Sequence, residues 1–249
     1  IVNTATEIFE AFTLVGSARP ELLKDAEALQ EVTKQAIVLS KASGDDLVTS
    51  VEAVTTTLGQ FQLGADKSRE IINQLAAGSK EGASEIADTT QALQKFGTTA
   101  AVTNVSTAES VALIETLADR QLKGAEAGTQ LRNILAKLAG ADVLPRSAVQ
   151  QLSEAGVSLN VLRDTSLPLS DRLKELGKIS GDTAALTKVF GLENLAAAQI
   201  ITQGIPKYEE LLVKIQGTDE AYKQAGINAD NFKTRVENLE KQGINALTR

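Results

Sequence analysis

The 249-residue sequence contains no cysteine, histidine, methionine or tryptophan. Without cysteine, disulfides, thiolate nucleophiles and cysteine-ligated metals are excluded. Without histidine, a nucleophile–histidine–acid triad cannot be assembled, and zinc loses both of its usual ligand types. No glycine-rich phosphate-binding loop is present either. The sequence therefore predicts no catalytic residues, no metal site and no cofactor site, and a protein that is not an enzyme.

One enzymatic arrangement stays open on composition alone. The 32 Asp and Glu residues could supply a carboxylate pair for glycoside hydrolysis. Sugar-binding grooves usually need aromatic platforms, however, and beside its six Phe the chain has two Tyr, Tyr208 and Tyr222. This scarcity weighs against a cell-wall lytic domain.

Aromatic residues make up 3% of the chain, whereas hydrophobic residues together make up 43%. The core must therefore consist of Leu, Ile, Val and Ala, which suits packed helices better than a β-sandwich. No apolar run approaches the roughly 20 residues that a membrane crossing needs, and the first eighteen residues lack the Lys or Arg of a signal peptide. Ile1 in place of a start methionine indicates a piece of a longer protein.

The net charge of −7 is unevenly distributed. Residues 1–110 carry eight Lys and Arg against fifteen Asp and Glu, whereas residues 111–249 carry seventeen of each. An acidic chain repels phosphate, so the composition predicts no specific nucleic-acid binding. A solvated acidic surface accounts for the imbalance.

Helical periodicity is the dominant pattern, because apolar residues recur at spacings of three and four. Four sets show it: Leu22, Ala26, Leu29, Val32, Ala36 and Leu39; Leu47, Val51, Val54, Leu58 and Phe61; Leu131, Leu135 and Leu138; and Phe232, Val236 and Leu239. The prediction is an all-α protein, a multi-helix array of short helices and stacked helical hairpins.

Helix start and stop signals agree with these stripes. Pro20, Pro145 and Pro206 stand just before helical patterns, where a missing N–H costs little. Ser106 and Glu109 have the spacing of a capping box. Glycines fall between the stripes, where helices stop, at Gly44, Gly64, Gly82, Gly97, Gly140, Gly181 and Gly217. Together these signals predict roughly ten helices.

Two segments depart from the helical pattern. Residues 98–107 are rich in Thr and have poor helix propensity, so we expect a connection there. Val157, Leu159 and Val161 alternate with polar neighbours, which predicts one short extended segment near 157–161, or a loop.

A weak internal repeat suggests two related hairpins. Val51, Leu58 and Phe61 match Ile86, Leu93 and Phe96 at an offset of 35, and Ile72 and Leu75 match Ile114 and Leu117. Chance similarity between amphipathic stretches is the alternative. We place a boundary between an acidic N-terminal part carrying this repeat, residues 1–140, and a C-terminal helical part, residues 141–249; one continuous domain is the alternative.

The segment from Gly124 to Leu138 stands out from the rest. Its physical interpretation is structural: Gly128 allows close backbone approach, and Thr129 caps or bonds a carbonyl. The leucines of the stripe are buried, and Arg132 pairs with a nearby acid.

This run also resembles the most distinctive motif of the phage tail tape measure core family, a phage minor tail protein family. The matching positions are Gly124, Ala127, Gly128, Thr129, Leu131, Arg132 and Leu135. Two later blocks are similar to recurrent blocks of that family in the same order, Leu152 to Leu173 and then Phe190, Gly191 and Glu193.

The resemblance implies a structural protein of the phage or prophage virion tail, made in the bacterial host cytoplasm, which takes part in tail tube assembly and in setting tail length. Implied partners are the tail tube protein, the tail tip initiator, a tail assembly chaperone and other copies of the chain, and the motif residues would serve structure or assembly. The alternatives from composition alone are a cellular helical scaffold or adaptor and, more remotely, the lytic domain.

Overall fold

The structure is a computed structural model that describes residues 5–231 of the chain. The described residues form α-helices and short 3-10 helices without a strand, so the predicted all-α class is confirmed. The α-helices are α1 (Ala5–Ala18), α2 (Ala26–Ser43), α3 (Leu47–Gln60), α4 (Ser68–Glu81), α5 (Ile86–Val102), α6 (Thr107–Ala118), α7 (Gly124–Ala139), α8 (Arg146–Glu154), α9 (Leu159–Arg163), α10 (Leu169–Gly177), α11 (Thr183–Phe190), α12 (Leu195–Gln203) and α13 (Ile205–Ile215). The 3-10 helices are η1 (Pro20–Lys24), η2 (Ala65–Lys67), η3 (Ala141–Val143) and η4 (Leu192–Asn194). A last described helix covers residues 220–231, whereas the stripe at Phe232, Val236 and Leu239 lies outside the described residues.

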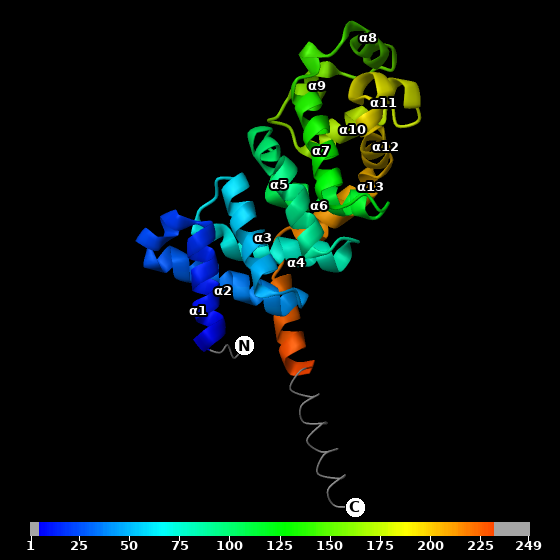
Figure 1. The fold of residues 1–249 in the computed structure, drawn as a ribbon. Helices are drawn as coiled ribbons and strands as arrows, with labels where there is room; N and C mark the ends of the chain where they lie inside the picture. The colour runs from blue at the N-terminus through cyan, green and yellow to red at the C-terminus, as the bar shows by residue number, and fades with distance from the viewer. Residues whose placement is uncertain (1–4, 232–249) are drawn as a thin grey trace, which may run out of the picture.

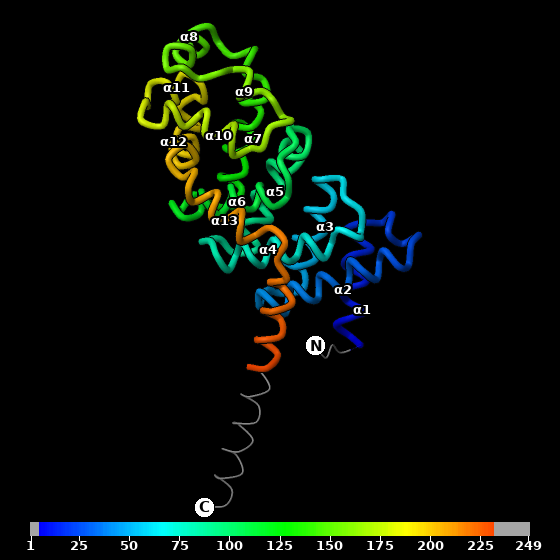
Figure 2. The backbone as a smooth tube through the Cα atoms, turned by 180° about the vertical axis from the view of Figure 1, so that it is seen from behind, coloured from blue at the N-terminus to red at the C-terminus, as the bar shows by residue number. Residues whose placement is uncertain are grey.

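The chain runs from α1 at one end of an elongated molecule to α8 at the other and then returns (Figure 1). On the way back, α13 packs against α6 and α4, and the last described helix reaches α2 (Figure 2). The buried Leu, Ile, Val and Ala side chains form one continuous core along this path.

The predicted pair of stacked hairpins is confirmed. Helices α3 and α4 form the first hairpin, and α5 and α6 form the second. Helix α3 lies against α5, and α4 lies against α6, so the two hairpins stack on one another. The matched residues of the repeat all belong to the core: each is buried except Phe61, which is half-buried.

Four helix ends share one geometry. A residue with positive φ follows the helix, and the next residue is apolar and donates its N–H to the carbonyl five positions earlier. The positive-φ residues are Gln62, Asn104, Gln121 and Gly156. The bonds are Leu63 to Leu58 (2.9 Å), Val105 to Ala100 (2.8 Å), Leu122 to Leu117 (3.2 Å) and Val157 to Leu152 (2.8 Å). Each apolar residue thereby closes its helix onto the core.

This geometry overturns the extended segment predicted near 157–161. Val157 is buried because it closes α8, not because it belongs to a strand. Ser158 then accepts the N–H of Val161 and caps α9, which begins at Leu159. The alternation of apolar residues came from a helix end followed directly by a helix start.

The connection predicted over residues 98–107 is also wrong for most of its length. Helix α5 continues to Val102, so residues 103–106 alone connect it to α6. Low Thr propensity is overridden by packing, and the Thr103 hydroxyl is satisfied by donating to the carbonyl of Thr99 at 2.8 Å. Gly97 lies inside this helix and does not end it. A Cβ there would come within 2.8 Å of the Gln60 Cβ, so this glycine permits close contact with the end of α3.

Other boundary predictions hold. Ser106 and Glu109 form the capping box of α6, and Pro145 directly precedes α8. Gly44 and Gly140 end α2 and α7.

Candidate functional site

The candidate site is built around α7, which consists of the segment singled out in the sequence. Gly124 opens this helix with φ +57°, a left-handed conformation that an L side chain rarely adopts. Lys123, the preceding residue, gives the helix no side-chain cap. A glycine is therefore required here by the backbone itself.

Gly128 brings α7 against the backbone of α5. A Cβ at this position would lie 2.7 Å from the Cα and 2.9 Å from the carbonyl carbon of Ala92. Neither backbone atom can move without shifting a helix, so only glycine permits this spacing. Ala127, beside it, is fully buried. The predicted close approach is confirmed, and it joins α7 to α5 along an extensive interface.

The apolar stripe of α7 faces the core as predicted. Leu131, Ile134, Leu135 and Leu138 are each at most 1% exposed. Each such side chain contributes about 1.5–3 kcal/mol when it is fully removed from water. The stripe therefore anchors the helix.

The two polar motif residues of α7 behave differently from one another. Thr129 donates its hydroxyl to the carbonyl of Ala125 at 2.8 Å, as one of the predicted roles required. Arg132 is exposed, and no hydrogen bond or ion pair joins it to any residue of the described part of the chain. The predicted ion pair of Arg132 is therefore wrong for the described residues, and its guanidinium lies on the exposed face of α7.

The motif blocks, far apart in sequence, meet in space where α7 faces the corner between α11 and α12. Lys137 donates to the Phe190 carbonyl at 2.8 Å, and the Asn133 amide donates to the Asn194 side chain at 2.9 Å. The Ala197 N–H in turn donates to Gln130 Oε1 at 3.2 Å. Three residues of α7, each about one turn from the next, therefore hold one corner.

The corner itself explains the Phe190-Gly191-x-Glu193 block. Phe190 is fully buried at the end of α11. Gly191 has φ +82°, and a Cβ there would lie 2.6 Å from the carboxyl carbon of Glu193. Glu193 is exposed and accepts a hydrogen bond from the Asn194 amide at 3.0 Å, while the same amide donates to the Phe190 carbonyl at 2.7 Å. The block is therefore a tight turn, held by hydrogen bonds from the Asn194 side chain to other residues of the same turn.

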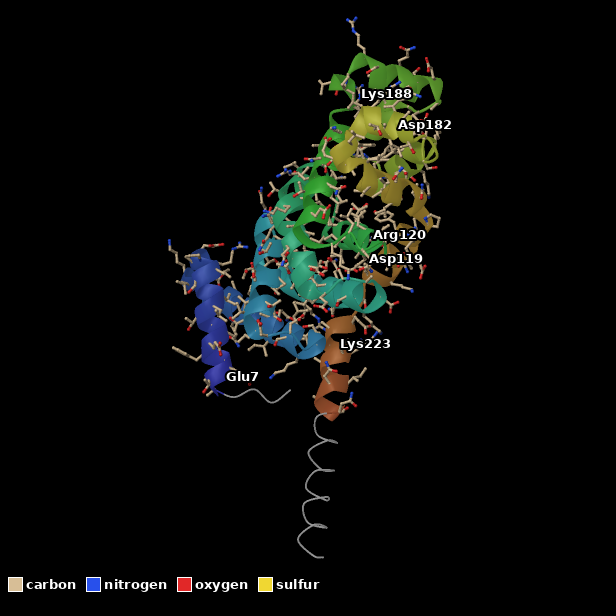
Figure 3. All side chains as sticks on the ribbon, turned by 45° about the vertical axis from the view of Figure 1, so that its right-hand side comes forward. Glu7, Asp119, Arg120, Asp182, Lys188 and Lys223 are labelled. Carbon is tan, nitrogen blue, oxygen red and sulfur yellow. The ribbon has the colours of Figure 1, made fainter. Side chains whose placement is uncertain are left out.

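At the far tip, polar contacts fix α8 on α11. Lys188 donates to Gln151 Oε1 at 2.7 Å, and the Gln151 amide donates to Asp182 at 3.1 Å. Asp182 and Lys188 both lie at this end of the molecule (Figure 3). The tip is thereby tied to the same corner.

The middle block contains a buried cation that sequence reasoning missed. Arg172 on α10 is 1% exposed and donates to the Leu162 carbonyl at 2.9 Å and to the Thr103 carbonyl at 3.4 Å. These carbonyls lie at the ends of α9 and α5, where a cation is favoured. Burial lowers the pKa of Arg172, and the nearby carboxylates of Asp164 and Glu109 raise it in opposition. Nothing in the sequence distinguished this arginine from a surface one.

Glu109 has the opposite role to Arg172, because its carboxylate accepts N–H groups at the starts of two helices. It closes the capping box of α6 and also accepts the N–H of Leu169, the first residue of α10, at 3.3 Å. Burial raises the pKa of the neighbouring Tyr208, and the Glu109 carboxylate adds to this shift. Glu109 and Arg172 together join four helix ends between the hairpins and the corner.

A second buried carboxylate, Glu115 on α6, was also missed. It accepts the N–H groups of Ala83 and Ser84, both at 2.9 Å, and the hydroxyls of Ser84 and Thr89. Burial raises its pKa, and these hydrogen bonds lower it in part. The signal was available, because α6 is apolar on every side and its single mid-helix acid had to be buried.

The hydrogen bonds of this site orient helices relative to one another. Its polar side chains bond helix ends, turn carbonyls and each other. Over residues 5–231, no group of three or more acidic, Cys or His side chains is placed to hold a metal ion. None of the helices in that range is both long and apolar enough to span a bilayer.

Comparison with known proteins decides the family. Residues 1–191 match the family described as phage-related minor tail protein. The chain belongs to this family. It is also 26% identical over 212 residues to a protein named tape measure protein from Pneumococcus phage Dp-1, an alignment that covers 81% of this chain and 18% of that relative. The chain thus spans less than a fifth of the length of the curated relative it matches, and no solved structure matches it.

Proposed function

We propose that this chain is a folded module of a phage tail tape measure protein, with a structural, non-enzymatic role in tail tube assembly and tail length determination. The observation that carries the proposal is the convergence of the motif blocks on α7, where Lys137 and Asn133 hold the Phe190–Asn194 turn. Family membership and the name of the Dp-1 relative support it.

The proposal places the protein in the virion tail after synthesis in the bacterial host cytoplasm. Its proposed partners are the tail tube protein, the tail tip initiator, a tail assembly chaperone and other copies of itself. Membership of a minor tail protein family supports tail partners in general, whereas a cellular adaptor or a lytic domain has no support from the site geometry.

The shape of the module suggests how it would serve length determination. A continuous helix of 249 residues would be about 370 Å long at about 1.5 Å per residue. The chain is instead folded into short helices that double back. It therefore adds little contour length, and its contribution would be assembly, with length set by extended stretches elsewhere in a longer polypeptide.

Two deletions in the phage gene would separate these roles. Deleting an extended helical stretch outside this module should shorten tails by about 1.5 Å per residue removed. Deleting residues 124–138 should instead abolish or misinitiate tail assembly. Electron microscopy of the particles measures both results.

A pair of point variants makes the second test sharper. Gly128→Ala forces a Cβ into the Ala92 backbone, whereas Gly181→Ala adds one in open space. The first variant should reduce the number of assembled tails without changing their length, and the second should leave both unchanged. If the 124–138 deletion gives normal tails that are shorter in proportion to the residues removed, the module acts only as a spacer. Unaltered tails after both deletions would contradict the tape measure role.

A further inference from the structure

An apolar groove of about 610 Å³ lies at the end of the molecule where α1 begins. Ile8 and Phe12 line it from α1, Ile37 and Val38 from α2, and Tyr222 from the last described helix. Glu7 on α1 and Lys223 on the last described helix lie at this same end of the molecule (Figure 3). This end is remote in sequence from the α7 motif.

The third wall is held in place by side chains from the first hairpin and α2. The Tyr222 hydroxyl donates to Gln35 Oε1 at 2.9 Å, and the Arg69 guanidinium lies 4.4 Å from the centre of the Tyr222 ring. Asn228 donates its amide to the Ala42 carbonyl at 3.0 Å, at the end of α2. The groove is therefore a formed feature of the fold.

Exposed apolar side chains flank the groove. Phe9, next to Ile8 on α1, is 74% exposed, and Ile227, which follows the groove residue Gly226, is 54% exposed. Exposed apolar side chains next in sequence to the residues of an apolar groove favour a contact with another protein at this place.

Unpaired charges of opposite sign accompany the groove and the exposed ring. Lys34 lines the groove, is exposed, and makes no hydrogen bond or ion pair with any described residue. Glu10, which follows Phe9 on α1, is likewise exposed and unpaired within the described residues. An incoming helix with an apolar residue next to an acid would match this surface, and α1 is such a helix.

We propose that this groove is a self-association surface, in which each of two copies inserts Phe9 of its α1 into the groove of the other. Because α1 carries Phe9 and also forms one wall of the groove, the contact is self-complementary and closes with two-fold symmetry. It also brings Glu10 of one copy to Lys34 of its partner, and so pairs charges that the single chain leaves free.

Sedimentation velocity of the 249-residue chain over a wide range of concentration tests the proposal. The wild type should shift from monomer to dimer as concentration rises. Phe9→Glu should raise the dimer Kd by at least about thirtyfold, the loss expected at a hot-spot residue. Val213→Glu is the matched control, because Val213 is 75% exposed on α13 and does not line the groove. It should dimerise as the wild type does.

Two further variants keep the test independent of folding. Gly226→Leu places a side chain where no atom lies within 4 Å of the new Cβ, so it should fill the groove and weaken dimerisation while circular dichroism stays unchanged. Lys34→Glu should weaken dimerisation alone, and its combination with Glu10→Lys should restore it.

A wild type that stays monomeric at every concentration would overturn the proposal, as would equal loss in Phe9→Glu and Val213→Glu. A monomeric chain that instead binds a different apolar helix would assign the groove to another partner. Because the readout is association of the isolated chain, it can fail while the tape measure role stands, and the converse also holds.

Discussion

Helices α7 and α1 carry the same sequence signal and have different environments. Both have apolar residues at helical spacing, over 16 and 14 residues. The stripe of α7 is almost entirely buried between α5 and the α11–α12 corner, whereas α1 exposes Phe9 and lines an open groove. A periodic stripe thus predicts a helix but does not predict what covers it. Close packing at α7 depends on Gly128, whose requirement comes from a neighbouring backbone.

The largest expected effect on stability concerns α7, the buried helix of this comparison. Leu135→Ala should lower the free energy of unfolding by about 2–5 kcal/mol, because it leaves a cavity at a side chain that is 1% exposed. Phe9→Ala should change it by no more than about 0.5 kcal/mol. Denaturant unfolding measures both, at a concentration where the chain is monomeric. Equal losses would show that α1 and α7 are packed alike.

A pair of helical glycines should respond with opposite signs. Gly128→Ala should destabilise by about 1–3 kcal/mol, because the added Cβ overlaps the backbone of Ala92. Gly226→Ala meets no atom within 4 Å and should stabilise by about 0.5–1 kcal/mol through helix propensity. Thermal melts followed by circular dichroism compare the two. Stabilisation by Gly128→Ala would refute the close contact between α5 and α7.

The pH dependence of stability should report the buried Glu115. Its pKa is raised by burial, so the folded state takes up a proton at a higher pH than the unfolded state does. Its contribution to stability therefore rises as pH falls through the folded pKa toward 4.5 and is lost as pH increases.

Glu115→Gln removes this proton uptake. Relative to the variant, the wild type should gain free energy of unfolding between neutral pH and about pH 5. Acids such as Asp46, whose pKa is lowered by the Thr49 N–H, act with the opposite sign but equally in both proteins. A wild-type-to-variant difference that does not change with pH would show that Glu115 is not buried as described.

The smallest expected effect concerns the exposed arginine of the motif. Arg132→Ala should alter stability by no more than about 0.5 kcal/mol, because the guanidinium has no partner among the described residues. If Arg132 serves assembly, the same variant should still reduce tail formation. A large loss of stability would show that Arg132 does form an ion pair within the chain.

Much of this fold could be predicted from the sequence, because helices and their ends are local. The stripe of α7 and the Ser106–Glu109 capping box depend on residues three or four apart. The errors arose where distant contacts override local preference: α5 continues through a Thr-rich segment because α3 and α7 pack along it. Val157 resembled part of a strand because apolar residues alternate around it. That alternation does not reveal the hydrogen bond from the Val157 N–H to the Leu152 carbonyl, which ends α8.

The site was only partly predictable for the same reason. The roles of Gly128 and Thr129 followed from their own chemistry. Arg172 bonds the carbonyl of Leu162, ten residues away, and that of Thr103, 69 residues away, and no spacing rule joins these residues. The exposure of Arg132 likewise depends on which residues surround α7 in space.

Native-state hydrogen exchange tests the central claim most directly, namely that the motif helix is the most firmly packed part of the fold. Amides of residues 131–138 should exchange only through global unfolding, and those of residues 9–13 in α1 should exchange faster through local opening. The measurement uses monomeric protein, so that association does not protect α1. Equal or faster exchange in α7 than in α1 would contradict the account.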